Sequence, residues 1–334
     1  MTLTPATFDT FGEAYVAVLR RIHDQPEYDT RGRGKDAIEV PNISFRLTDP
    51  IRRSPYLAAR RANIVFNHAE ALWYLSGSDD LAMIGYYAPR LEKLSADGIR
   101  LTGTAYGPRL FGADGTDGRS QFDRVIDLLR DDPDSKRAAM LVMRPDELID
   151  PGNPDVACTL GLQFLLRGGQ LHATTYMRGN DAVIGLLCDT FSFTMIQELA
   201  ARRLGVEVGT YTHHVGSMHI NVLDITKVEE ILAEADRTPA PMFPRSPMPD
   251  TSPEELATVL WWEQALRAGG TTLTAEAATR VPVSGYWRQV LLLFEAYRQI
   301  RETGDPVTAD ITAALAAGNR WLMATRWPDR IGMP

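Results

Sequence analysis

LGLQFLLRGGQLHATTYM, residues 160–177, consists of two apolar segments joined by Gly168-Gly169. A two-residue glycine link tolerates the positive φ angles of a tight hairpin turn, so the segment predicts two antiparallel strands, Leu160–Arg167 and Gln170–Met177. A long, mostly apolar segment, Phe191–Leu204, follows and ends at Gly205, which indicates a helix with a glycine cap. The centre of the chain is therefore expected to pack a helix against a sheet.

The same patterns extend in both directions from this hairpin, without the regular strand–helix alternation of a doubly wound sheet, so an α+β fold is predicted. A segment rich in proline and serine, Pro239–Pro253, predicts a linker between a core, residues 1–240, and a helical C-terminal extension, residues 241–334. The other expected strands are Ile38–Leu47, Ala138–Met143 and Val206–Val215. The other expected helices are 8–22, Ala62–Leu75, Gln121–Arg130, Ile225–Ala235, Ser252–Ala268, Tyr286–Thr303 and Thr308–Ala324.

Composition excludes several classes of protein. The net charge of −8 argues against a nonspecific nucleic-acid binder, which needs a basic face. The two cysteines, Cys158 and Cys188, form no CxxC pair, so neither a disulfide framework nor a structural zinc site is expected, and no metal is predicted. No apolar run approaches the ~20 residues of a membrane span, and the first residues lack a signal-peptide pattern. The expectation is a cytoplasmic protein without a membrane partner.

Two reactive side chains flank the hairpin, with Cys158 before its first strand and Arg178 directly after its second. Six motifs follow one another in this chain: Glu70–Gly77, Ala105-Tyr106-Gly107, Asp132–Arg137, Ala157-Cys158-Thr159, Tyr176–Asp181 and Gly216–Asn221. In this order, from about Arg31 to Asn221, the chain resembles the thymidylate synthase superfamily, which includes the pyrimidine nucleotide hydroxymethylases. The resemblance implies a mixed sheet packed by helices and a homodimer formed sheet to sheet.

The chemistry of this superfamily requires a cysteine thiolate that adds to C6 of a pyrimidine and thereby makes C5 nucleophilic. A thiol titrates at roughly 8.5, so a guanidinium beside Cys158 is needed, and Arg178 is the candidate. Cys158 alone would be interpreted as a small buried side chain, as Cys188 is here. Glu70, within an apolar helix, is expected to act as an acid–base group through water. The resemblance assigns Tyr106 to proton removal from C5.

The resemblance also supplies the substrate contacts. Phosphate ligands would be Arg178, one of Arg31 and Arg33, and Lys136 with Arg137 donated across the dimer interface. Three departures from the family pattern, Gly179 for serine, Lys136 for arginine and Asn221 for tyrosine, leave room for a ribose 2′-hydroxyl. They favour CMP over dCMP. Further substrate contacts are assigned to Ser192, His219 and Asn221.

Asp189 stands where relatives acting on uracil carry asparagine. A carboxyl group can accept from the N4 amine of cytosine and share a proton with N3, so Asp189 predicts a cytosine nucleotide. Its place before Phe191–Leu204 also suits a helix N-cap, and the two interpretations are compatible.

The one-carbon donor implied by the resemblance is 5,10-methylenetetrahydrofolate, with Asp181 on the pterin and Gly185 and Tyr86 beside it. Asp189 groups the chain with members that add water, which predicts a CMP 5-hydroxymethylase, and a role in nucleoside antibiotic assembly is a hypothesis drawn from that substrate. The alternatives are a dCMP hydroxymethylase, a methyl-transferring synthase, and a non-catalytic regulator that binds nucleotide or RNA.

Overall fold

The computed structural model describes residues 4–32, 34–114 and 117–332. The predicted hairpin is confirmed as β5, Thr159–Arg167, and β6, Gln170–Met177, which pair antiparallel from Arg167 opposite Gln170. Gly168 and Gly169 have φ angles of 58° and 76°, values that favour glycine. Because the strands run antiparallel, the start of β5 lies beside the end of β6.

The sheet is mixed, as an α+β fold requires. Its strands follow the order β1-β3-β8-β6-β5-β4, with β2 paired to β3 and β7 paired to β8. The long central strand β8, Glu207–Asn221, runs antiparallel to β3, Lys35–Leu47, and parallel to β6. The remaining strands are β1, Ala6–Phe8, β2, Tyr28–Gly32, β4, Ala139–Leu141, and β7, Asn180–Asp181.

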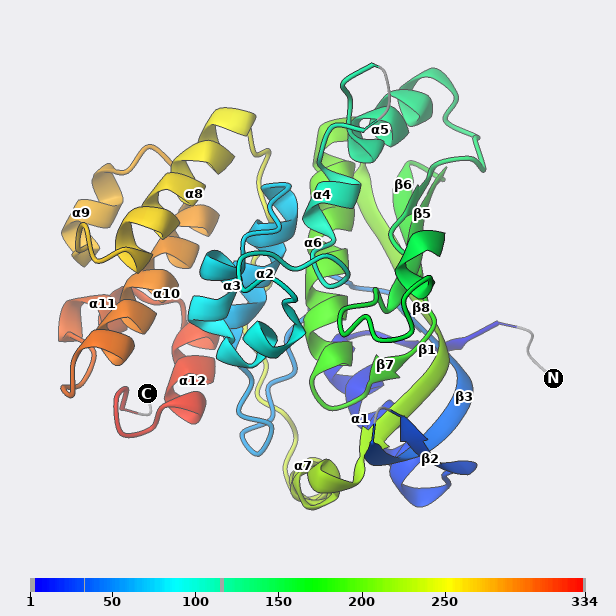
Figure 1. Cartoon of the computed structure of the whole chain (residues 1–334). Coiled ribbons are helices and arrows are strands. Elements are labelled where there is room, and N and C mark those ends of the chain that lie inside the picture. Colours follow the sequence, from blue (N-terminus) through cyan, green and yellow to red (C-terminus); the bar gives the residue numbers. More distant parts are fainter. Residues whose placement is uncertain (1–3, 33, 115–116, 333–334) are drawn as a thin grey trace.

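The helices gather on one side of the sheet (Figure 1). α6, Gly185–Leu204, lies along the sheet, and α2, Ile64–Leu75, packs on α6 with all twelve of its residues buried. α1, Phe11–Asp24, packs beside β3. The other core helices are α3, Leu81–Tyr87, α4, Gly107–Leu110, α5, Gln121–Asp131, and α7, Ile225–Arg237, with short 3₁₀ turns at Pro89–Leu94, Pro145–Leu148 and Val222–Asp224.

The opposite face of the sheet presents side chains to the outside. Tyr176 of β6 is 40% exposed and stacks on His214 of β8 with ring centroids 5.4 Å apart. Leu141 of β4 and Leu160 of β5 are also exposed. An exposed sheet face with aromatic and aliphatic side chains is a surface that a second protein can cover.

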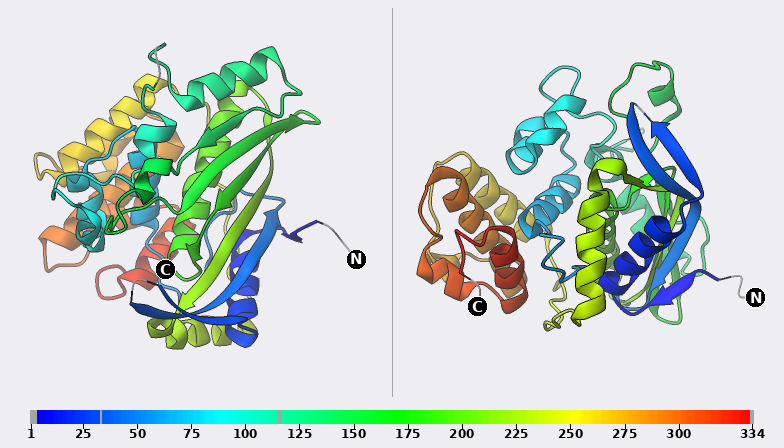
Figure 2. Two further views of the ribbon diagram at one scale, coloured as in Figure 1. Left: turned by 45° about the vertical axis from the view of Figure 1, so that its right-hand side comes forward. Right: turned by 90° about the horizontal axis from the view of Figure 1, so that it is seen from below.

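The C-terminal helices lie beyond α2, on the side away from the sheet (Figure 2). They are α8, Pro253–Arg267, α9, Ala275–Arg280, α10, Gly285–Glu302, α11, Ala309–Ala314, and α12, Ala317–Arg326. The buried Tyr87 hydroxyl donates to Glu263 of α8 at 2.8 Å. In the linker, the Met248 N–H donates to the buried Glu198 of α6 at 2.7 Å. Both bonds tie the extension and its linker to the core.

The predicted single helix Thr308–Ala324 is wrong, because it is divided into α11 and α12. Leu315 and Ala316 between them are extended, with ψ of 135° and 145°. The side-chain amide of Gln289 donates to the Ala314 carbonyl and accepts from the Ala316 N–H, so a tertiary contact replaces the helical hydrogen bonds at the break. None of the helices among the described residues is both long and apolar enough to cross a bilayer.

Candidate active site

Cys158 and Arg178 meet where β5 begins and β6 ends. The Arg178 N–H donates to the Cys158 carbonyl at 2.9 Å, and Nη2 of Arg178 lies 3.7 Å from the Cys158 Sγ. The guanidinium is held in place by the Ala157 and Val156 carbonyls, at 2.8 and 3.0 Å. Cys158 is only half-buried. A fixed positive charge beside a partly accessible sulfur favours the thiolate.

The loop before Cys158 is fixed by Asp155, which is 3% exposed. Its carboxylate accepts from the backbone N–H groups of Thr102, Gly103 and Thr104, each at 2.8 Å, and from the Thr104 hydroxyl at 2.5 Å. The backbones approach so closely that a Cβ on Gly103 would lie 2.0 Å from the Asp155 carbonyl oxygen. Four donors on one buried carboxylate leave this loop little freedom.

A buried ion pair supports the same loop from the other side. Glu147 accepts from Arg109 Nη1 at 2.5 Å and from the Ala157 N–H at 2.6 Å, one residue before Cys158. Arg109 also donates to the Val142 carbonyl at 2.6 Å and to the Thr102 carbonyl. Sequence reasoning missed Asp155, Glu147 and Arg109, since their partners are mostly backbone groups from distant segments, which no side-chain pattern reveals.

Two carboxyl groups with raised pKa values lie near each other, the buried Glu70 and the half-buried Asp189. Burial, and next the charge of Asp189, raise the pKa of Glu70 to about 8. The Ser192 hydroxyl donates to Glu70 Oε2 at 3.3 Å. Burial raises the pKa of Asp189 to about 7, against a hydrogen bond from Asn180 that lowers it. Both groups can therefore carry a proton near neutral pH, as acid–base chemistry requires.

The structure corrects the interpretation of Asp189 as a helix N-cap. α6 begins at Gly185, so Asp189 lies within the helix, where its Oδ2 accepts from Nδ2 of Asn180 at 2.7 Å. Gly185, predicted as a neighbour of the folate, has no side chain where α6 starts, and a Cβ there would lie 2.9 Å from Nδ2 of Asn180. Asn180 is thus a further site residue that sequence reasoning passed over, although it lies within a quoted motif.

Tyr106 is buried between these groups. Its ring stacks on Tyr74 at 5.0 Å, and burial, followed by the charges of Asp189 and Cys158, raises its pKa well above the usual value. Tyr106 therefore lies within electrostatic reach of both the candidate nucleophile and Asp189. The structure thus brings Cys158, Arg178, Glu70, Asp189 and Tyr106 into one neighbourhood.

The edge of the site is formed where β7 pairs with β8. Asp181 lies opposite His219, and its carboxylate accepts from the Val183 N–H at 2.8 Å. Burial raises the pKa of Asp181, and the nearby His219 lowers it. Asn221 ends β8, opposite Ala37 of β3. His219, Asn221 and Asp181 are therefore grouped at one end of the central strand.

Comparison with known proteins identifies the family of the chain. A family model named Thymidylate synthase matches residues 13–256. The chain belongs to the thymidylate synthase family.

Two phage relatives share the name deoxyuridylate hydroxymethyltransferase and match over part of their length. The one from Bacillus phage SP01 is 32% identical over 224 residues, 62% of this chain and 58% of the relative. The one from Delftia phage PhiW-14 is 30% identical over 203 residues, 57% of this chain and 55% of the relative. The chain thus spans less than two thirds of either. A third protein of that name, from Pseudomonas phage M6, is 27% identical over 302 residues, 84% of this chain and 81% of the relative.

The residues that the thymidylate synthase resemblance assigned to phosphate binding lie farther apart than the residues around Cys158. Arg31 on β2 is exposed, with Nε 3.5 Å from Asp36 Oδ1. Arg33 lies outside the described residues. Lys136 and Arg137 are exposed, and the Lys136 carbonyl accepts from Gln163, which lies in mid-β5 and not at the Cys158 end. The structure therefore does not bring this basic pair to the chain's own cysteine.

The three remaining predicted positions differ in their surroundings. A Cβ on Gly179 would meet its nearest atom, the Ser217 carbonyl oxygen, at 3.7 Å, so packing does not demand glycine there. Tyr86 packs on α10 with its ring 5.6 Å from that of Tyr297 and the Arg301 guanidinium 5.2 Å away. Ser192 is fully buried, and its hydroxyl is directed at Glu70.

Four arginines converge between the core and the C-terminal helices. Burial, and next the charges of Arg61, Arg60 and Arg90, lower the pKa of Arg326 on α12. Among the described residues, none of the four forms an ion pair with a carboxylate, and the Nε of Arg60 is buried without a hydrogen-bond partner. Arg61 donates to the Arg326 carbonyl at 3.2 Å, and Arg90 and Arg326 lie over the rings of Phe66 and Trp327, so their partners are uncharged. Cations that repel one another in this way favour a bound anion.

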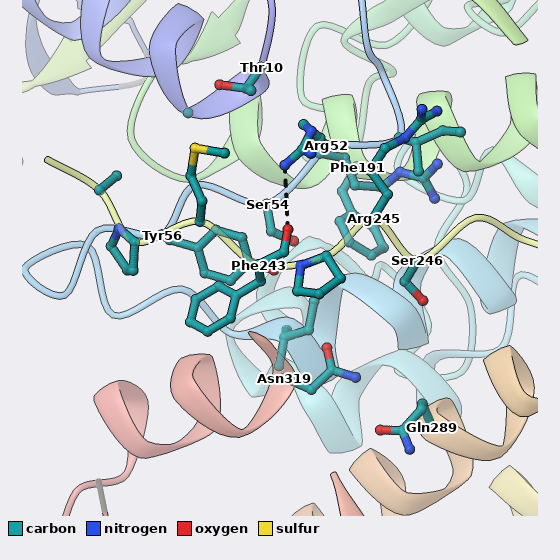
Figure 3. A pocket seen from close by; sticks show the side chains of 18 of the residues that line it. Thr10, Arg52, Ser54, Tyr56, Phe191, Phe243, Arg245, Ser246, Gln289 and Asn319 are labelled. Atoms are coloured by element: carbon teal, nitrogen blue, oxygen red, sulfur yellow. Dashed lines mark hydrogen bonds between the residues drawn. The ribbon is translucent and has the colours of Figure 1, made fainter. Parts of the chain in front are cut away.

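A cavity of about 320 Å³ lies elsewhere, under the linker (Figure 3). Arg52, Tyr56 and Phe243 line it, and Arg52 donates to the Phe243 carbonyl at 3.4 Å. It contains none of the predicted site residues. The described residues also contain no group of three or more histidine, cysteine, aspartate or glutamate side chains placed to hold a metal.

Proposed function

We propose that this protein is a one-carbon transferase that hydroxymethylates C5 of the cytosine ring of CMP. The observation that carries the proposal is the Arg178 guanidinium 3.7 Å from the Cys158 sulfur, with the two proton-carrying carboxyl groups Glu70 and Asp189 in the same site. A nucleophile with its counter-ion and a neighbouring acid–base group is what addition to a pyrimidine ring needs.

Each residue has a chemical role in this proposal. The Cys158 thiolate forms a bond to C6, which makes C5 nucleophilic. Glu70, with a pKa of about 8, holds or releases a proton near neutral pH, and Tyr106 assists removal of the C5 proton. C5 then bonds to the methylene carbon of the one-carbon donor, and loss of the C5 proton with departure of tetrahydrofolate leaves an exocyclic methylene on C5. Addition of water to this methylene, with elimination of the Cys158 thiolate from C6, gives 5-hydroxymethyl-CMP. The names of the three phage relatives support hydroxymethyl transfer over methyl transfer.

The co-substrate in this proposal is 5,10-methylenetetrahydrofolate, which supplies the one-carbon unit. The chain's residues fit such a group in two places. Asp181 offers a carboxylate near the start of α6 for a pterin ring. The cluster of Arg60, Arg61, Arg90 and Arg326, which forms no carboxylate ion pair within the described part of the chain, offers cations for the carboxylates of the glutamate tail. Gly185 and Tyr86 are proposed neighbours of the folate.

The choice of cytosine depends on Asp189. Its pKa of about 7 allows a protonated carboxyl group that donates to N3 and accepts from N4. The relatives are named for deoxyuridylate, so base choice is the sharpest test. Asp189→Asn should shift preference from CMP toward uracil nucleotides, and an unchanged preference for cytosine would contradict the assignment.

The choice of ribose depends on the space at Gly179, with Lys136 and Asn221 as further contributors. Because a Cβ at 179 would meet nothing closer than 3.7 Å, Gly179→Ser should fold normally. We expect it to lower kcat/KM for CMP more than for dCMP, since the hydroxymethyl group fills space that the 2′-hydroxyl needs. Equal losses for both substrates would contradict this role. A dCMP hydroxymethylase is the alternative that this assay distinguishes.

The site is proposed to be completed in a homodimer formed through the exposed sheet face. Lys136 and Arg137 would reach the phosphate in the partner's site, where Arg178, one of Arg31 and Arg33, Ser192, His219 and Asn221 also serve the substrate. Mixing two inactive variants, Cys158→Ala and a Lys136→Ala/Arg137→Ala double variant, tests this. Random exchange should restore about a quarter of the wild-type sites. No recovery after confirmed subunit exchange would contradict a shared site.

The decisive assay is release of tritium from 5-tritiated CMP in the presence of methylenetetrahydrofolate, repeated with dCMP and dUMP, with product mass measured. A product heavier by a hydroxymethyl group supports the proposal, and a methyl product indicates a synthase. Release that is absent with all three nucleotides would favour a non-catalytic nucleotide- or RNA-binding protein. A role in antibiotic assembly rests only on the proposed substrate.

A further inference from the structure

Among the described side chains, Asn180 is the one that donates a hydrogen bond to the Asp189 carboxyl group, and it has two unusual features. It is 4% exposed, and its Nδ2 donates to Asp189 Oδ2 at 2.7 Å. Its own Oδ1 is buried and has no hydrogen-bond partner. A buried amide oxygen that accepts no hydrogen bond lowers the stability of the folded state, so the presence of asparagine at this position calls for an explanation.

The surrounding backbone fixes Asn180 in this position. It lies on β7, paired with Met218 of β8, and the start of α6 presses against its amide so closely that Gly185 has no room for a side chain. Asp189, by contrast, keeps part of its surface accessible. The amide is therefore rigid, and the carboxyl group that it contacts is open to a ligand.

We propose that Asn180 is a second base-selecting residue, which fixes Asp189 Oδ2 as a hydrogen-bond acceptor and presents its own Oδ1 to the exocyclic amine of cytosine. This inference rests on the proposed function. A carbonyl-type oxygen is the better acceptor, so donation from Nδ2 keeps Oδ2 free of the proton and leaves any proton on Oδ1 of Asp189.

This order of donor and acceptor is what distinguishes the two bases. A carboxylic acid can pair with cytosine or with uracil, depending on which oxygen carries the proton, so Asp189 alone is ambiguous. With Asp189 Oδ2 held as an acceptor, Asp189 and Asn180 together present acceptor oxygens to the N4 amine of cytosine. The protonated Oδ1 of Asp189 donates to N3. Uracil has a carbonyl oxygen at C4 in place of the amine, and it would leave the Asn180 oxygen unpaired.

The protonation state of Asp189 gives a second readout. The groups that face Asp189 are Asn180 and Asp181 from β7, Glu70 and Tyr74 from α2, Tyr106, Cys188 and Tyr211. The Asn180 hydrogen bond lowers the Asp189 pKa. CMP affinity should fall as the pH rises and Asp189 loses its proton. Removal of Asn180 should move this midpoint to higher pH.

The experiment measures binding of CMP, UMP and ribose 5-phosphate by calorimetry to the full-length wild type, Asn180→Ala and Asn180→Asp. Ribose 5-phosphate lacks the base and reports the integrity of the phosphate site. We expect Asn180→Ala to weaken CMP at least tenfold, to reduce the CMP/UMP ratio and to leave ribose 5-phosphate unchanged. Asn180→Asp loses the donor and adds a like charge beside Asp189, so it should weaken CMP further.

Three outcomes would overturn the inference. An unchanged CMP/UMP ratio in Asn180→Ala, with the wild type still preferring CMP, refutes Asn180 alone and leaves the proposed function intact. A parallel loss of all three ligands indicates a structural role only. A wild type without preference for CMP refutes the proposed base choice itself, and the selecting role of Asn180 with it.

Discussion

Replacement of Glu147 by alanine is expected to be severe, although Glu147 is outside the six motifs that indicated the family. Glu147 and Arg109 are 8% and 5% exposed, and Nη1 of Arg109 lies 2.5 Å from Oε1. Removal of one partner from a buried ion pair costs about 3–5 kcal/mol, because the other charge is left without compensation. Arg109 also donates to two backbone carbonyls, which still compensate part of its charge when Glu147 is removed. We therefore expect a loss of unfolding free energy at the lower end of this range, about 3 kcal/mol.

The same substitution releases the backbone that carries the nucleophile. The Ala157 N–H loses its acceptor at 2.6 Å, one residue from Cys158. Urea denaturation should show the loss of unfolding free energy. The activity at saturating substrate, calculated per folded molecule, should also be lower than that of the wild type. Glu147→Gln retains an acceptor for Ala157 and should lose less of both.

Glu230→Ala is the matched control, since Glu230 forms an exposed pair with Lys227 at 3.0 Å. Such pairs contribute about 0–1 kcal/mol. If Glu147→Ala loses less than about 1 kcal/mol, or no more than the control, the assigned role of the buried pair is refuted.

Three further predictions concern backbone space, pH and the basic cluster. Gly103→Ala should lose about 1–3 kcal/mol or more of unfolding free energy and reduce activity, because its Cβ would lie 2.0 Å from the Asp155 carbonyl oxygen. The control Gly179→Ala should unfold like the wild type in thermal denaturation, because its Cβ would meet nothing closer than 3.7 Å. Glu70 and Asp189 have folded-state pKa values above their ordinary ones, so the folded state binds more protons than the unfolded state, and the free energy of unfolding falls as the pH rises from about 4 toward 8. The fall is up to ~1.4 kcal/mol per pH unit for each group. Between pH 5 and pH 8 a Glu70→Gln/Asp189→Asn double variant should lose less unfolding free energy than the wild type, and equal losses would contradict the two pKa shifts. Arg326→Ala removes a cation that repels its neighbours, so thermal stability should be unchanged or higher while KM for the folate rises, and an unchanged KM would exclude the cluster from folate binding.

The central part of the fold was predictable because its signals are local. Gly168-Gly169 identifies the hairpin, and antiparallel pairing then requires that Cys158 and Arg178, at its two open ends, meet. The spacing therefore brings the two backbone positions together, while the resemblance selected Arg178 as the guanidinium and the Ala157 and Val156 carbonyls orient it. Glu70 was likewise expected to be interior because apolar residues surround it in its helix.

Other parts depend on tertiary contacts that no local pattern reveals. The start of α6 was placed six residues too late, at Phe191, whereas the helix begins at Gly185, whose close approach to Asn180 is a tertiary contact. The break between α11 and α12 depends on the side chain of Gln289, 25 residues away. Asp155 binds backbone N–H groups about 50 residues earlier in the chain, which any residue types could supply.

The linker bears on how far this chain can be shortened. The Met248 N–H donates to Glu198, which also pairs with Arg53 in the interior, and the Thr251 hydroxyl accepts from the Trp287 indole at 2.9 Å. A chain ending at residue 240 would keep every predicted residue of the cysteine site but lose Met248 as a donor to a buried carboxylate. It would also uncover α2, whose residues are all buried. Deletion of the C-terminal helices would thus require compensating substitutions at Glu198 and along α2, and core and extension are expected to have diverged together.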